Sequence, residues 1–123
     1  FPWQPLDMIS DVYSACSVEL IPLTKSVIYN SFPSKGSLLM ACGKCIVCAV
    51  EDDSDYFRSI NANHVGVCVS RDNPNKLAEA ILYLKNNPEQ LRVIERNAVG
   101  YGREQYSSTV NLSKLRKIIF EII

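Results

Sequence analysis

The chain lacks an excess of charge of either sign, because 13 Lys and Arg residues balance 13 Asp and Glu residues. A balanced chain has no broad basic surface for nucleic acid or an anionic membrane, so we expect no nucleic-acid partner. It also lacks an apolar run of the ~20 residues that a membrane-spanning helix needs. Its single histidine, His64, lies at a predicted helix-to-strand turn, where we expect a structural role.

The cysteines lack the patterns of a metal cluster or a disulfide framework. Cys42, Cys45 and Cys48 have the spacing of the first ligands of an iron–sulfur run, but the further cysteine that such a run requires is absent. In a strand, Cys45 and Cys48 would also point to opposite faces. We therefore expect buried thiols and no metal. An odd number of cysteines without a signal peptide further indicates reduced thiols in a cytoplasmic protein.

Apolar periodicity predicts strands that alternate with helices. The predicted strands are 18–23, 45–50 and 65–69. The predicted helices are 7–16, a helix from Ser34 to a stop at Gly43, one after Ser54, and three that begin at Pro74, at Pro88 and near Leu112. Nearly continuous apolar strands between helices indicate a parallel sheet with both faces covered. We therefore predict an α/β fold with a Rossmann-like parallel sheet, of which about half is present.

Local signals predict how these helices begin. Ser34, Ser54, Asn73 and Asn87 are predicted N-caps. Asn73 and Asn87 are each followed by a proline, and Gln90 occupies the capping-box position of the second. We expect side-chain caps at these positions.

Parallel sheets bind ligands beyond the carboxyl ends of their strands. The segments 24–34, 51–54 and 70–73 follow the predicted strands, so we expect them at this edge, with 24–32 as a polar loop. The carboxylates of 52–55 resemble a metal-binding cluster, but the following helix makes an N-terminal capping run the better interpretation.

Four stretches follow one another in a fixed order: MISDVYSACSVELIPL, NSFPSKGSLLMACGKCIV, EDDSD and HVGVCVSRDNPNKLAEAILYLKNNPEQLRVIERNAVGYGREQYS. Together they resemble the C-terminal half of the nucleotide-sugar domain of family 4 retaining glycosyltransferases, which have the GT-B architecture. The bacterial branch with a Pro-Ser-Lys motif (33–35) and a Met-Ala-Cys-Gly-Lys helix end (40–44) is particularly similar. The resemblance covers essentially the whole chain. It implies that the parent enzyme transfers a sugar from a nucleotide diphosphate sugar to a glycan or lipid-linked acceptor in polysaccharide biosynthesis, with no metal or other cofactor.

The resemblance also implies that the helix beginning near Ser34 points its N-terminus at the donor diphosphate. Free backbone N–H groups and the helix dipole form an anion site there. We assign the contact to Ser34, Lys35, Gly36 and Ser37, with Gly36 permitting close approach and Lys35 adding a charge. From the residues alone, the alternative is an ordinary capped helix with a solvated lysine.

The sequence departs from the family at two glutamates that contact the donor sugar and the ribose. The equivalent residues are Asn30 and Leu38. Asn30 can hydrogen-bond a sugar hydroxyl, whereas Leu38 loses a charge-assisted bond worth about 1.5–3 kcal/mol. Segment 1–5 matches the loop that contacts the base, with Trp3 or Gln4 as candidates and packing of Trp3 as the alternative. The catalytic residues are unknown, because the family's catalytic histidine belongs to the N-terminal domain.

The chain opens at Phe1 without a methionine, and three strands are few for a doubly wound domain. We therefore expect residues 1–123 to form one partial domain of a larger cytoplasmic enzyme whose N-terminal domain is missing, with contact to the inner face of the membrane left open. Alone it should be inactive, because half a domain cannot orient acceptor against donor. The alternatives are a degenerate, non-catalytic GT-B-like scaffold or partner-binding module, and a flavodoxin-like binding domain unrelated to sugars.

The predicted terminal helix carries an apolar stripe that a lone helix cannot bury. Its members are Leu112, Leu115, Ile118, Ile119 and Ile122. In the resembled fold this helix packs back toward the other domain, so we expect self-association through it when that domain is absent.

Overall fold

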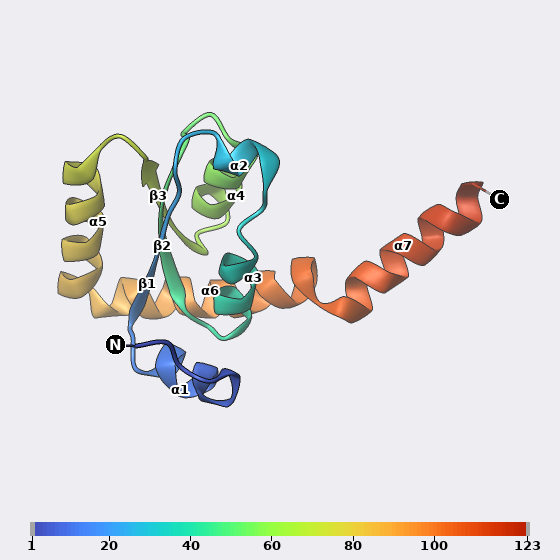
Figure 1. Cartoon of the computed structure of the whole chain (residues 1–123), viewed down its shortest axis with the longest axis horizontal. Coiled ribbons are helices and arrows are strands. Elements are labelled where there is room, and N and C mark those ends of the chain that lie inside the picture. Colours follow the sequence, from blue (N-terminus) through green and yellow to red (C-terminus); the bar gives the residue numbers. More distant parts are fainter. Residues whose placement is uncertain (1, 123) are drawn as a thin grey trace.

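Three parallel strands form the centre of the fold (Figure 1). The computed structural model describes residues 2–122, and Phe1 and Ile123 lie outside the described residues. The strands β1 (Val18–Pro22), β2 (Cys45–Val50) and β3 (Gly66–Ser70) lie in the order β1-β2-β3. In this register Cys48 pairs with Ile21 on one side and with Cys68 on the other. The prediction of an α/β fold with a parallel, partial Rossmann-like sheet is confirmed.

The helices occupy most of the predicted segments. They are the 3₁₀ turn η1 (Leu6–Met8), α1 (Ile9–Ser14), α2 (Val27–Asn30), α3 (Ser34–Ala41), α4 (Asp55–Ala62), α5 (Pro74–Asn86), α6 (Pro88–Tyr106) and α7 (Ser108–Ile122). The prediction of a loop throughout 24–32 is wrong, because α2 forms one helical turn within it. That turn has four residues, which is too few for an apolar periodicity to predict a helix.

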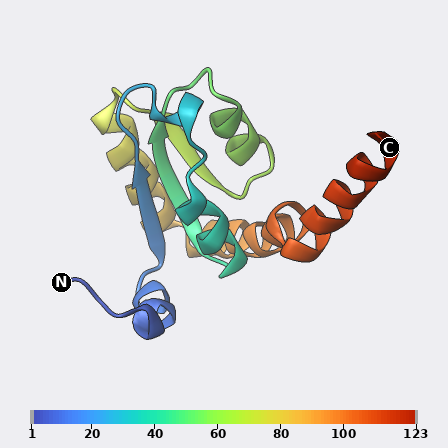
Figure 2. The same ribbon diagram turned by 45° about the vertical axis from the view of Figure 1, so that its right-hand side comes forward.

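Helices cover both faces of the sheet, with α3 and α4 on one face and α5 on the other (Figure 2). All six side chains of β2 are buried. Ile46, Cys48 and Val50 belong to one hydrophobic cluster, and Cys45 and Val47 belong to the other. Cys48 belongs to the cluster under α3 and α4, and Cys45 belongs to the cluster under α5 and the beginning of α6. The prediction that these two thiols point apart is therefore confirmed.

The helix termini follow local chemistry in most cases. The Ser54 hydroxyl accepts from the Phe57 N–H (3.2 Å), and the Asn73 side chain accepts from the Lys76 N–H (3.0 Å), so these two predicted caps are confirmed. Gly43 ends α3 with φ = 71°, a conformation that favours glycine.

Two of the predicted side-chain caps do not form, although Asn87 does occupy the N-cap position of α6. Ser34 is the first residue of α3 and not its cap, because the fixed φ of Pro33 already places the turn one residue earlier. Asn87 forms neither a side-chain cap nor a capping box with Gln90. Its amide turns back to donate to the Tyr83 carbonyl (2.7 Å), because Asn87 also ends α5.

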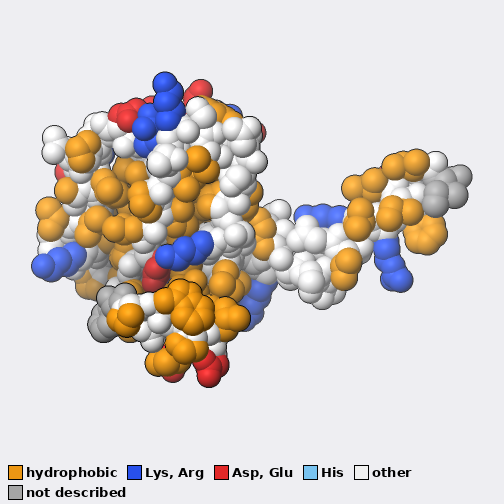
Figure 3. All heavy atoms as spheres, in the orientation of Figure 1, with side chains coloured by type: hydrophobic (Ala, Val, Ile, Leu, Met, Phe, Trp, Pro, Cys, Tyr) orange, Lys and Arg blue, Asp and Glu red, His pale blue; other side chains and the backbone are white. Residues whose placement is uncertain are grey.

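The terminal helix α7 projects from the body of the molecule, and no residue of it is buried (Figures 1 and 3). Ile118 and Ile122 are 53% and 79% exposed. Among residues 2–122, no helix is long and apolar enough to cross a membrane. Self-association through α7 stays a prediction.

Candidate functional site

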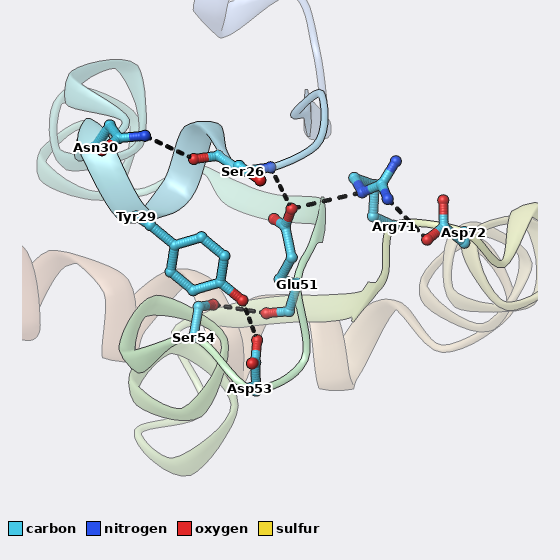
Figure 4. Close-up of polar contacts among 8 residues, drawn as sticks. All are labelled: Ser26, Tyr29, Asn30, Glu51, Asp53, Ser54, Arg71 and Asp72. Carbon is cyan, nitrogen blue, oxygen red and sulfur yellow. Dashed lines mark hydrogen bonds and ion pairs between the residues drawn. The ribbon is translucent and has the colours of Figure 1, made fainter.

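The loops that follow the three strands meet at the carboxyl edge of the sheet (Figure 4). Ser26 follows β1, Glu51 follows β2 and Arg71 follows β3. The Ser26 N–H donates to the Glu51 carboxylate across 2.6 Å, and the Arg71 Nε lies 3.6 Å from the same oxygen. One carboxylate therefore links all three loops.

The Glu51 side chain is mostly buried, with 15% of its surface exposed. Its second oxygen, Oε2, has no hydrogen-bond partner among the described residues. Arg71 is anchored independently, since its N–H donates to the Val50 carbonyl (3.0 Å) and its guanidinium donates to Asp72 (2.8 Å). A buried carboxylate is costly to leave unpaired, so the contacts to Ser26 and Arg71 constrain all three residues.

Ser26 has a left-handed backbone, with φ = 65°. This conformation costs a residue other than glycine roughly 1–2 kcal/mol, so the surrounding contacts must maintain it. The Glu51 carboxylate holds the Ser26 N–H, and the Asn30 amide donates to the Ser26 carbonyl (3.2 Å). Asn30, the residue predicted to contact the donor sugar, is thus connected to the strand ends through Ser26.

A second contact holds α2 against the loop after β2. The Tyr29 hydroxyl donates to the Asp53 carboxylate. This hydrogen bond raises the pKa of Tyr29 to about 12, with the negative charges of Glu51 and Asp52 contributing. The phenol is therefore neutral at physiological pH.

A cavity of about 570 Å³ lies beside α2. Its lining includes Tyr29, Asn30, Phe32, Tyr56, Tyr101 and Tyr106. The Phe32 ring packs edge-on against Tyr56 with 5.1 Å between centroids, and it lies 5.5 Å from the Tyr106 ring. Burial raises the pKa of Tyr106, with the neighbouring Tyr101 adding to the shift. No sequence pattern predicts this cavity, because its walls come from α2, α4 and α6, which are distant in sequence.

The N-terminus of α3 carries free donors. The N–H groups of Ser34 and Lys35 make no hydrogen bond within residues 2–122, and Pro33 supplies no side-chain cap. The Gly36 N–H donates to the Pro33 carbonyl (2.9 Å), and the Ser37 hydroxyl donates to the Ser34 carbonyl (3.1 Å). Two of the four residues assigned to the diphosphate therefore offer unpaired backbone N–H groups.

Lys35 has a partner that the sequence analysis did not foresee. Its ammonium lies 3.2 Å from the carboxylate of Glu19, a buried residue of β1, and 6.0 Å from the centre of the Tyr13 ring. The Lys35 side chain is 48% exposed, so its ammonium keeps access to solvent.

Close packing explains why position 36 is a glycine. A Cβ at this position would overlap the Tyr56 hydroxyl and would lie 3.4 Å from the Ile21 Cδ1. The Tyr56 hydroxyl is buried and has no hydrogen-bond partner among the described residues. Burial raises the pKa of Tyr56.

The remaining predicted residues lie apart from one another. Leu38 is exposed on α3, where it borders a shallow groove beside Arg103 of α6. Trp3 is 84% exposed, and Gln4 donates to the Pro2 carbonyl (2.9 Å) and lies beside Cys16, before β1 begins. The structure therefore places Trp3 and Gln4 near the amino end of β1 and does not bring them to the carboxyl edge.

Two of the buried thiols, Cys45 and Cys68, are neutral. Burial raises the pKa of Cys45 to about 12, with the charge of Glu95 adding to the shift. A hydrogen bond with Cys48, together with burial, raises the pKa of Cys68. Within residues 2–122, no group of His, Cys, Asp and Glu side chains has the arrangement of a metal site.

No protein-family model, curated protein or solved structure matches the chain.

Proposed function

We propose that this chain belongs to the donor-binding domain of a retaining glycosyltransferase, which transfers a sugar from a nucleotide diphosphate sugar to a glycan or lipid-linked acceptor. The proposal rests on the sequence resemblance and on one structural observation, the free N–H groups of Ser34 and Lys35 at the start of α3. The first turn of α3 contains no acidic residue. Such a helix start stabilises an anion through its unpaired donors and its dipole.

The lysine strengthens this anion site. The Lys35 ammonium has three N–H donors. Its ion pair with Glu19 does not occupy all three, so the ammonium can also contact a phosphate oxygen. Gly36 and Ser37 continue the helix turn that faces the diphosphate in this proposal. The Gly36 N–H already has a partner, so Ser34 and Lys35 supply the main backbone contacts.

Asn30 is the proposed contact to the donor sugar. Asn30 is one of the residues that line the aromatic cavity, and the segment 31–33 connects it to α3. The base contacts assigned to Trp3 and Gln4 require a different position of segment 2–5, so they carry no weight in this proposal. Catalysis requires a second domain across a closed cleft, and the 123 residues alone are expected to be inactive.

A non-catalytic scaffold is the second candidate. Leu38, at the position of the family's ribose-binding glutamate, is an exposed apolar residue that cannot hydrogen-bond a ribose hydroxyl. An exposed leucine at this position suits a protein contact better than a sugar contact.

Calorimetric titration of the full-length protein that carries this segment, with UDP, GDP and their sugar conjugates, tests the proposal. The informative variant is Ser34→Pro, because proline is tolerated at the first helical position and removes only an N–H that has no partner in the fold. We expect unchanged stability and a roughly 10- to 100-fold loss of nucleotide affinity, the range for a hydrogen bond to a charged group.

Ser108→Pro is the matched control, since Ser108 is the first residue of α7. It should leave nucleotide binding unchanged. Wild-type affinity in Ser34→Pro would place the nucleotide elsewhere. A well-folded wild-type protein that binds no nucleotide would favour the scaffold.

A further inference from the structure

The short helix α2 is held in place mainly by polar contacts. It has four residues, none of them buried, and no side chain caps its N-terminus. Ile28 contributes partial packing against the core. A single helical turn has little stability of its own, so its position depends on the contacts at its two ends.

The contact at the beginning of α2 converges on Glu51. Ser26 precedes the helix, and its N–H donates to the Glu51 carboxylate across 25 positions of sequence. The Ser26 carbonyl faces the helix and accepts from the Asn30 amide. The left-handed backbone of Ser26 directs its N–H to the carboxylate while its carbonyl accepts from the helix end.

Glu51 is itself held rigidly. It follows the last residue of β2 directly, and its side chain is mostly buried. Arg71, at the end of β3, lies against the same oxygen that accepts from Ser26. The carboxylate is thus a fixed point on the sheet from which the position of α2 is set.

We propose that Glu51 is a positioning residue: through Ser26 it holds the Asn30 amide where the sugar of the donor is recognised. This inference rests on the proposed function for the identity of the ligand. The diphosphate is bound by the start of α3, which Glu51 does not contact. Loss of Glu51 should therefore weaken recognition of the sugar and spare recognition of the nucleoside diphosphate.

The experiment compares the dissociation constants of a nucleotide sugar and of the matching nucleoside diphosphate, UDP or GDP, in the full-length protein. Glu51→Ala should lower the affinity for the nucleotide sugar about 10-fold and the affinity for the nucleoside diphosphate less than 2-fold. Glu51→Gln keeps an oxygen acceptor for the Ser26 N–H and should restore most of the affinity. Asp72→Ala is the control, because Asp72 contacts Arg71 at the same edge and does not touch Ser26.

A double-mutant cycle locates the effect. If Glu51 acts through Asn30, then Asn30→Ala should cause the same selective loss, and Glu51→Ala should add nothing to it. An equal loss of affinity for the nucleotide sugar and for the nucleoside diphosphate would show that Glu51 only supports the fold. Additive losses, or no loss at all in Glu51→Ala, would also overturn the inference.

The two proposals can fail separately. If the wild-type protein binds neither ligand, the proposed function fails, and NMR decides the positioning role. In that case Glu51→Ala should shift the Asn30 side-chain amide signals and accelerate exchange of the Ser26 amide at least 10-fold, whereas Asp72→Ala should change neither. Unchanged Asn30 and Ser26 signals in Glu51→Ala would overturn the inference.

Discussion

At the scale of single residues, the close approach of Tyr56 to Gly36 shapes the start of α3. The space that glycine leaves open is filled by a hydroxyl that has no conventional hydrogen bond of its own. The glycine that the sequence analysis assigned to phosphate binding is therefore required for packing in any case. Its effect on stability can be measured without a ligand.

Gly36→Ala should destabilise the fold by about 1–3 kcal/mol, because the added Cβ overlaps the buried Tyr56 hydroxyl. Tyr56→Phe removes that hydroxyl and should be nearly neutral, since no hydrogen bond is lost. In the Tyr56→Phe background, Gly36→Ala should therefore cost much less. Urea unfolding followed by circular dichroism measures all four proteins, and an equal cost in both backgrounds would contradict the packing argument.

The five cysteines should divide by reactivity. Cys16 and Cys42 are exposed, whereas Cys45, Cys48 and Cys68 are buried. In a native titration with a thiol reagent at pH 8, we expect the two exposed thiols to react rapidly and the three buried thiols to react only in denaturant. Rapid reaction of a third thiol in the native protein would show that the core under α3 or α5 opens.

The neutral state of Cys45 predicts how stability depends on pH. Its folded pKa of about 12 lies above the value of about 8.5 for an unfolded thiol, so the unfolded chain loses its proton first as pH rises. This contribution to stability is complete below pH ~8.5 and is lost as pH rises toward 12. The unfolding free energy should therefore fall above pH 9, and Cys45→Ala should reduce the slope. An identical slope in that variant would contradict the assignment.

At the scale of secondary-structure elements, the predicted N-caps of α4 and α6 differ in whether their side chains act. The Ser54 side chain caps α4, whereas the Asn87 side chain makes no cap hydrogen bond to α6 and donates to the preceding helix. Ser54→Ala should cost about 0.5–2 kcal/mol in urea unfolding. Asn87→Ala loses one exposed hydrogen bond and should cost less. The reverse order would contradict the observed geometry.

At the scale of the whole molecule, α7 projects from the body (Figure 1), and none of its described residues is buried. Its apolar stripe is exposed and it contributes no buried residue to the core. Removing residues 108–122 should therefore leave the unfolding free energy of the remaining chain nearly unchanged, which urea unfolding would test. A large loss of stability would show that α7 packs on the body.

The same stripe should cause concentration-dependent self-association when nothing else covers it. Light scattering should detect this association in the 123-residue chain. The double variant Ile118→Asp/Ile122→Asp, which places charge on the stripe, should be monomeric. A monodisperse monomer of the unmodified chain at high concentration would count against the prediction.

The strands and several helix ends can be predicted from the amino-acid sequence, because they depend on neighbouring residues. The unbroken apolar run of β2 predicts a strand buried on both faces, and Ser54, Asn73 and Gly43 act on backbone groups within a few positions. The resemblance then directed attention to the start of α3 and to Asn30. Both were identified from sequence motifs alone, without knowledge of long-range contacts.

Contacts between residues that are distant in sequence are evident only in the folded chain. The Lys35–Glu19 ion pair, the link from Ser26 through Glu51 to Arg71, and the overlap of Gly36 with Tyr56 all join residues from different elements. Periodicity and capping rules act over one or two turns of chain, so they carry no information about these pairs. The link through Glu51 arises because parallel strands bring their carboxyl ends, and the loops that follow them, to one edge of the sheet. The other two pairs arise because α3 packs against β1 and α4.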